Sequence, residues 1–381
     1  MRLLDFLCFF VVVITSIFFS YDAYQNRDYN WDLPGYLGVY YKNQFPEDKV
    51  KVHQLVYSQI QKESSPDVFF KVMGLDEPTK ATHSFATNSE AFDQQLPYYE
   101  IKFLYNAVIC FLSQFGLSIS LSAQLPNFIF YFLSSVLLFF IFYEIFYKKS
   151  ILAALFTLVL ISLPFFRVIA ISCTPDSFAI FMLLYFMFSV IKKYSNFYLF
   201  LILVFLVLIR PDYIIFGVTY FFAVVMYQFL KKRSIDYQQV IFMLVLLAVY
   251  FGILRLYQYP GWKSVFYDSF IHRRNFISTE PAIFSLKKYV EITLNALIYM
   301  KKVNLVAIVF TTISWFYARN SWDKIVAILL FINLQLKFLT FPAAGEYRFF
   351  VGFLLIITIW SIYLLVKNNF VISNYFHKKI T

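Results

Sequence analysis

Carboxylates and arginines stand beside long apolar segments of this chain, where an isolated charge is costly. The carboxylates are Asp32, Asp176, Asp212 and Glu346, and the arginines are Arg210 and Arg348. A carboxylate can act as the general base that takes a proton from a hydroxyl group, and arginines can stabilise the charge on a departing phosphate. Ionisable groups held at the ends of membrane helices indicate a functional site. The set therefore suits transfer of a group from a phosphate to a hydroxyl acceptor.

Each of these residues alone also has a structural interpretation. Asp176 and Asp212 each follow a proline, so each would lie in the first turn of a helix and stabilise the positive end of its dipole. Arg210 would then pair with Asp212 or extend its head group to the membrane interface. Asp32 would cap a helix that begins near Pro34. What favours a site is that the residues come from distant parts of the chain and would meet at one membrane depth.

The composition indicates which elements position these residues. The chain has 381 residues, of which 60% are hydrophobic and 14% are charged, with a mean hydropathy of +0.66. A soluble chain is about half apolar and a quarter charged. The apolar runs are continuous over roughly 15 to 22 residues, which suits helices that cross a bilayer better than the alternating strands of a barrel. We therefore expect an all-α polytopic transmembrane bundle that forms one integral-membrane domain over residues 1–381.

Clusters of lysine and arginine predict the topology. They lie at 148–149, 192–193, 231–233, 319–324 and 367–379. If all of them are cytoplasmic, ten spans follow. These are expected at about 3–20, 126–147, 151–170, 176–191, 194–209, 213–230, 238–256, 303–318, 323–341 and 349–366. Both termini would then be cytoplasmic in a cell membrane (inner or plasma membrane), and the net charge of +11 would serve contact with anionic lipids and not with nucleic acid.

Two polar loops would lie on the extracytoplasmic side. The first covers residues 21–125 and includes 101–119, which is apolar enough to span. A span there would move every later basic cluster to the extracytoplasmic side. We therefore expect a juxtamembrane helix at 101–119 instead. The second loop covers 257–302 and contains His272, Arg273 and Arg274, which would suit a phosphate or a polyanionic acceptor.

Five short motifs carry a resemblance to a known family. They are NWDLPGYLG after the first span, QLPYYEIKFLYNAV at the end of the first loop, CTPDSFAIF, LIRPDYIIF and GEYRFF. With this layout the chain resembles the GT-C class of integral-membrane glycosyltransferases, which take sugars from polyprenyl-phosphate carriers on the extracytoplasmic side. The resemblance covers roughly residues 1–230 and 341–360.

The resemblance implies an inverting hexosyl transfer from a polyprenyl-phosphate-linked sugar to a glycan, lipid or protein acceptor. Asp32 would be the catalytic base and Asp176 a second acidic residue. The substrate- or phosphate-binding residues would be Arg210, Asp212, Glu346, Arg348, His272, Arg273 and Arg274. The chain lacks a tandem acidic pair after the first span, because Asp28 and Asp32 are four residues apart. This departure leaves open which of the two is the base and whether a divalent metal takes part, although no cluster of residues has metal-ligand spacing.

The sequence leaves three alternatives open, one of which is a non-catalytic scaffold. A polysaccharide polymerase or ligase would also be a sugar-lipid enzyme with basic outer loops. A lipid-linked sugar transporter or flippase would need helices broken by glycine or proline near the middle of the membrane. The chain has only nine glycines and its charges lie at helix ends, so the sequence favours an enzyme.

Overall fold

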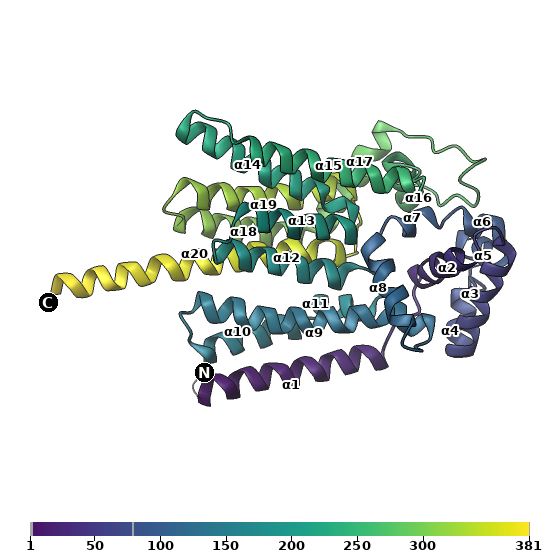
Figure 1. Ribbon diagram of the computed structural model, residues 1–381, viewed down its shortest axis with the longest axis horizontal. Coiled ribbons are helices and arrows are strands. Elements are labelled where there is room, and N and C mark those ends of the chain that lie inside the picture. The colour runs from purple at the N-terminus through teal and green to yellow at the C-terminus, as the bar shows by residue number, and fades with distance from the viewer. Residues whose placement is uncertain (1–2, 78–79, 381) are drawn as a thin grey trace.

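The long helices of this protein run side by side and its short helices gather at one end of them (Figure 1). The computed structural model describes residues 3–77 and 80–380, and every regular element in that part of the chain is a helix. The long helices are α1 (Leu3–Gln25), α9 (Ile119–Ile145), α10 (Ser150–Ser162), α12 (Asp176–Ile191), α13 (Asn196–Ile209), α14 (Ile214–Lys232), α15 (Tyr237–Leu256), α18 (Lys301–Tyr317), α19 (Ser321–Thr340) and α20 (Arg348–Ile380). The expected all-α class is confirmed.

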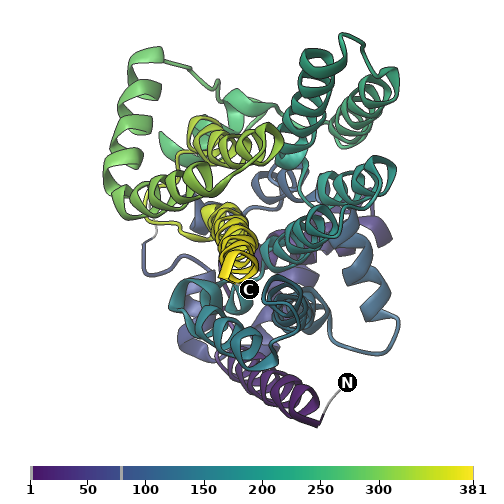
Figure 2. The same ribbon diagram turned by 90° about the vertical axis from the view of Figure 1, so that its left-hand side faces the viewer.

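The helices of the bundle differ in how far they are buried. Figure 2, which views the bundle end-on, shows α20 in the middle and α1 at the edge. In the most apolar stretch of α20, 61% of the residues are buried, against 11% in α1. An apolar helix that is exposed on nearly all sides needs lipid around it, which supports the membrane assignment.

The structure supports fewer spans by length and composition than the ten that the sequence predicts. Five helical segments are long and apolar enough to cross a membrane, and two bent helix pairs raise the number to seven among the described residues. Each of the ten predicted spans coincides with a helix, but α12 and α13 have only 16 and 14 residues. At 1.5 Å per residue they reach about 24 and 21 Å, short of the roughly 30 Å of a hydrocarbon core. The count of ten is therefore not confirmed.

One of the bent pairs has a clear local cause. The chain turns by 63° between α10 and α11 (Pro164–Ile171). The residue before a proline is pushed out of the helical region, and Leu163 is extended, with φ −67° and ψ 133°. The helix therefore breaks at Leu163, and α11 continues in a new direction.

The short helices that we call the outer helices fill most of the first loop. They are α2 (Asp32–Gln44), α3 (Lys49–Glu63), α4 (Pro66–Val72), α5 (Ala81–Thr87), α6 (Ser89–Asp93), α7 (Pro97–Glu100) and α8 (Phe103–Ser113). Side chains of Asp48, Ser65 and Asn88 cap three of them. At 11 residues α8 is about 17 Å long, half of what a span requires, so its length suits the expected juxtamembrane helix. The second loop carries α16 (Trp262–Phe270) and α17 (Leu286–Tyr299).

Two glycines allow α2 to lie directly against α6 and α7. A Cβ atom at Gly35 would lie 2.5 Å from the ring of Tyr99, and one at Gly38 would lie 2.6 Å from a methyl group of Leu96. Any side chain at either position would push α2 away. This close packing fixes the start of α2, where Asp32 lies.

Hydrogen bonds fasten the outer helices to the bundle. The backbone N–H of Asp28 donates to the carbonyl of Ile171 at 3.2 Å. The phenol of Tyr105 in α8 donates to the carbonyl of Ala123 in α9 at 2.7 Å. Tyr105 and Ala123 are fully buried, so breaking the bond between them would leave a buried hydroxyl and a buried carbonyl without partners. The outer helices and the bundle therefore hold one fixed relation at this boundary.

The arrangement predicts that Thr87 and Ser234 lie on opposite sides of the membrane. Both residues are exposed, Thr87 in α5 and Ser234 between α14 and α15. Helix α5 and the turn from α14 to α15 lie at opposite ends of the bundle (Figure 1). With Cys8 and Cys110 replaced by serine, we expect an impermeant maleimide to label Thr87→Cys on intact cells. Ser234→Cys should react only after permeabilisation. Equal labelling of both variants on intact cells would contradict this topology.

Candidate functional site

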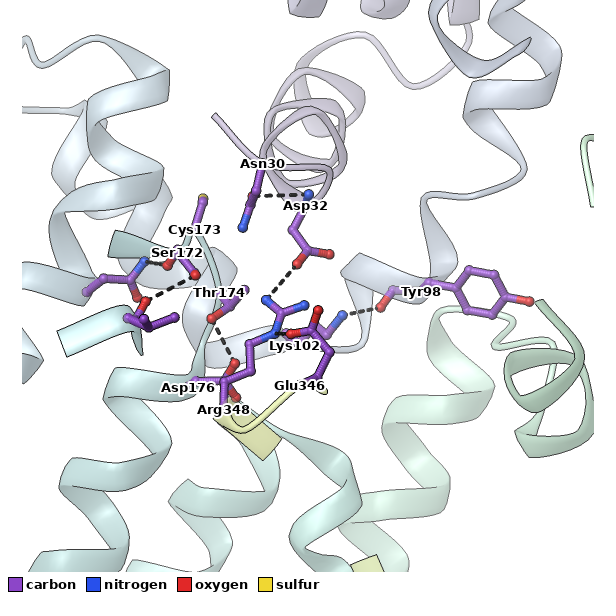
Figure 3. Close-up of polar contacts among 12 residues, drawn as sticks. Asn30, Asp32, Tyr98, Lys102, Ser172, Cys173, Thr174, Asp176, Glu346 and Arg348 are labelled. Atoms are coloured by element: carbon purple, nitrogen blue, oxygen red, sulfur yellow. Dashed lines mark hydrogen bonds and ion pairs between the residues drawn. The ribbon is translucent and has the colours of Figure 1, made fainter. Parts of the chain in front are cut away.

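Asp32 and Arg348 come from opposite ends of the chain and meet where the outer helices join the bundle. The Nη1 atom of Arg348 donates to Oδ2 of Asp32 at 3.2 Å, and its Nε lies 3.2 Å from Oε2 of Glu346. Figure 3 shows the Asp32 carboxylate pointing from α2 toward this guanidinium. Asp32 is the first residue of α2 and not its cap; the N–H of Asp32 donates to Oδ1 of Asn30 at 3.2 Å. Three of the predicted residues are thus brought together.

A second group of charges forms around Arg210 at the end of α13. Its guanidinium pairs with Asp176 at the start of α12. The Nε atom of Arg210 is 3.2 Å from Oδ1 of Asp212 in η1 (Pro211–Tyr213). Thr174 also donates its hydroxyl to Oδ2 of Asp176 at 2.8 Å. Arg210 therefore pairs with Asp212, as one interpretation of the sequence held, and with Asp176 in addition.

Lys337 in α19 completes this second group. Its ammonium pairs with Asp212, and the Lys337 side chain is 6% exposed. Nothing in the sequence analysis singled it out. The sequence feature that could have identified Lys337 is its position as a single lysine near the outer end of an apolar segment. A lone charge there is costly unless it has a partner.

The ring of Phe349 joins the two groups of charges. The guanidinium carbons of Arg348 and Arg210 lie 5.0 and 5.3 Å from the centre of this ring. The Nζ atom of Lys337 lies 5.8 Å from it. Three cations thus lie around one aromatic side chain at distances that allow cation–π attraction, and the ring connects the two groups of ion pairs.

Lys102 is a further cation of the site. It precedes α8, and its ammonium donates to the carbonyl of Tyr98 at 2.6 Å (Figure 3). Burial lowers the pKa of Lys102 to about 8; the Asp32 carboxylate opposes this effect, whereas Arg210 and Arg348 add to it. The sequence alone did not identify Lys102 as a residue of the site. A lysine with this pKa is a cation that can lose its proton near neutral pH.

Asp28 lies close to Asp32, and the two differ in their surroundings. Burial raises the pKa of Asp28; Arg348 opposes this rise, while the charge of Asp32 adds to it. Asp32, in contrast, receives a hydrogen bond from Arg348. Both carboxylates therefore belong to the site, and the choice of base between them stays open.

A cavity of about 240 Å³ opens among the outer helices next to Asp32. It is lined by Tyr29, Asn30, Trp31, Pro34, Gly35, Tyr57, Lys71, Val72, Gly74, Asp76, Lys80, Thr82, Phe85, Phe92, Gln95, Leu96, Tyr99 and Arg273. Tyr99 connects the cavity to the charges, because burial and then the Asp32 carboxylate raise the pKa of its phenol. The phenol stays protonated and can donate a hydrogen bond beside Asp32.

The three basic residues predicted in the second loop have separate surroundings. Arg274 is buried and donates to both carboxylate oxygens of Asp268, at 2.7 and 2.9 Å. His272 is exposed, whereas Arg273 lines the cavity. Only Arg273 of the three therefore lies near the Asp32 site.

A metal site is not evident in the described part of the chain. Among those residues, no group of three or more His, Cys, Asp or Glu side chains could hold a metal ion. The site described above consists instead of carboxylates, each paired with or close to a cation.

No protein-family model, no curated protein and no solved structure matches this chain. The likeness to GT-C glycosyltransferases accordingly rests on the five sequence motifs.

The charge pairs predict unequal effects of two substitutions. Asp212→Asn would leave the buried Lys337 ammonium without its carboxylate, at a cost on the order of 2 kcal/mol. Lys337→Met would leave Asp212 still paired with Arg210, so its cost should be smaller. We expect a lower Tm for Asp212→Asn than for Lys337→Met in detergent. The double variant should recover most of the loss, and equal Tm values for both single variants would contradict a paired Lys337.

Proposed function

We propose that this protein is a membrane glycosyltransferase that moves a sugar from a polyprenyl-phosphate carrier to an acceptor hydroxyl on the extracytoplasmic face. The observation that carries the proposal is the contact between Asp32 and Arg348 at the boundary of the bundle and the outer helices. It combines a carboxylate that could act as the base with a cation that could bind a phosphate, where the outer helices meet the ends of the long helices. The motifs shared with GT-C enzymes support the same assignment.

In the proposed reaction the sugar is displaced from its phosphate in one step. Asp32 takes the proton of the acceptor hydroxyl while the acceptor oxygen forms a bond to the anomeric carbon. The bond from that carbon to the phosphate oxygen breaks, and the phosphate keeps the electron pair. A single displacement inverts the configuration at the anomeric carbon.

The cations of the site would stabilise the negative charge of the departing phosphate. Arg348, which now binds Asp32 and lies beside Glu346, would turn one or more of its N–H groups to the phosphate. Arg210 and Lys102 add positive charge nearby, and charge on the phosphate grows as the bond breaks. Release from Arg348 would also leave the Asp32 carboxylate free to accept the proton.

A polymerase or ligase would use this same chemistry with a glycan acceptor, and the cavity beside Asp32 suits an acceptor of that kind. A lipid-linked sugar flippase would need the cations but no base. Substitution of Asp32 therefore separates the enzymes from the flippase.

The principal test is Asp32→Asn. The donor is first identified by mass spectrometry of lipids that copurify with the protein, and transfer is then measured with that donor. Loss of the base should lower the turnover by roughly 10²- to 10⁴-fold, while Arg348 still finds an oxygen acceptor at residue 32.

The matched control is Asp67→Asn, an exposed aspartate in the first turn of α4, which should leave turnover unchanged. Asp28→Asn shows which carboxylate is the base. Full activity of Asp32→Asn together with loss of activity in Asp28→Asn would transfer that role to Asp28. Full activity in both would overturn the proposal.

Lys102 should give donor binding a pH dependence. Because the pKa of Lys102 is about 8, its ammonium is lost as the pH rises through that value. We expect the KM for the donor to rise several-fold between pH 7 and 9. Lys102→Arg keeps its charge over this range and should flatten the profile. The same rise of KM in that variant would exclude Lys102 as its source.

A further inference from the structure

Two residues that line the cavity beside Asp32 each have a buried polar atom that finds no partner among the described residues. Gln95 is 3% exposed, and its Nε2 donates to the carbonyl of Arg274 at 3.4 Å. This bond directs the amide, and its Oε1 accepts no hydrogen bond from the described residues. The Nε–H of Arg273 is likewise buried without an acceptor in that part of the chain. Gln95 and Arg273, which both line the cavity, therefore each have a buried polar atom just behind its wall with no hydrogen-bond partner among the described residues.

Aromatic rings form the other part of the wall. The rings of Trp31 and Phe85 lie 5.4 Å apart, and the Arg273 guanidinium lies 5.4 Å from the centre of the Trp31 ring. It also lies 5.1 Å from the Tyr98 ring. Because these faces hold the guanidinium in place without neutralising it, its charge stays available to a ligand.

The charge of the lining is positive. The lining contains three cations and one carboxylate: Lys71, Lys80 and Arg273, and Asp76. Lys80 has Glu77 as an ion-pair partner at 2.5 Å, whereas Lys71 and Arg273 form no ion pair with a described residue. The cavity therefore favours an anion that also carries hydroxyl groups.

We propose that this cavity binds an anionic sugar, a pyranose ring that carries a carboxylate or a phosphate, as the acceptor of the transfer. The anionic group would pair with the guanidinium of Arg273, and a C–H face of the ring would lie on Trp31. At about 240 Å³ the cavity is smaller than the roughly 300–1,000 Å³ of sites for drug-sized ligands. It has room for one sugar unit, and the rest of a glycan would extend outside.

The position of the cavity explains the link to transfer. Trp31 precedes Asp32 directly, and Tyr99 both lines the cavity and lies near the Asp32 carboxylate. A hydroxyl of a sugar held on Trp31 would therefore face the proposed base. The role as acceptor rests on the proposed function, whereas the binding of an anionic sugar does not.

Binding can be measured by saturation-transfer difference NMR on the full chain in nanodiscs. The probes are methyl β-glucuronide, methyl glucoside 6-phosphate and the neutral methyl β-glucoside. We expect at least one anionic probe to bind tenfold or more tightly than the neutral one, and the better probe identifies the anionic group. Equal binding of all three, or no binding, would overturn the proposal.

Variants place the bound sugar in the cavity. Arg273→Gln should lower the affinity for the anionic probe about tenfold and bring it to that of the neutral sugar. Trp31→Leu should remove the ring-proton signal for all bound probes. The matched control, Lys263→Gln, removes an exposed cation from the same loop and should change nothing. Unchanged anionic binding in both Arg273→Gln and Trp31→Leu, each with an unaltered Tm, would overturn the assignment to this cavity.

Failure of this inference can be told apart from failure of the proposed transfer reaction. Asp32→Asn should keep the binding of the anionic probe and lose transfer. Anionic binding in a protein without transferase activity would support the cavity and refute the enzyme. Transfer to neutral acceptors by a protein that binds no anionic probe would support the enzyme and refute the anionic-sugar site in the cavity.

Discussion

The ion pair between Asp32 and Arg348 is the contact on which the site depends. It joins the first outer helix to the last helix of the bundle, across more than 300 residues of sequence. Both side chains are mostly buried, 22% and 19% exposed, so each is the charged partner that keeps the other in place. The close packing of α2 on Tyr99 and the position of α20 in the middle of the bundle keep both partners from moving apart.

Around that pair, the charges are organised by the need to neutralise one another. Asp176, Arg210, Asp212 and Lys337 alternate in sign along a connected chain of contacts. Phe349 lies beside three cations and connects this chain to Arg348. An anionic ligand that enters could take over part of the pairing without leaving a cation buried alone. Such exchange is what a phosphate-binding site at a membrane surface requires.

The two loops contribute in unequal ways. The first loop supplies Asp32, Lys102 and most of the cavity, while the second loop adds Arg273 to its wall. Arg274, the next residue, is used in a buried pair with Asp268 that holds the second loop in shape. Neighbouring arginines thus serve different purposes, and only their packing distinguishes them.

The sequence by itself determined the all-α class with helices that suit a membrane, the positions of the long helices and the choice of Asp32, Asp176, Arg210 and Arg348 as candidate site residues. These follow from local properties, because an apolar run of sufficient length needs lipid and a charge beside it needs a partner. Only the tertiary structure decided which partner each charge has, and it alone added Lys337 and the cation role of Lys102. It also decided that Arg273 lines the cavity while Arg274 does not, and that some expected spans are short or bent. These outcomes depend on contacts between residues far apart in the chain, which no local pattern of residues encodes.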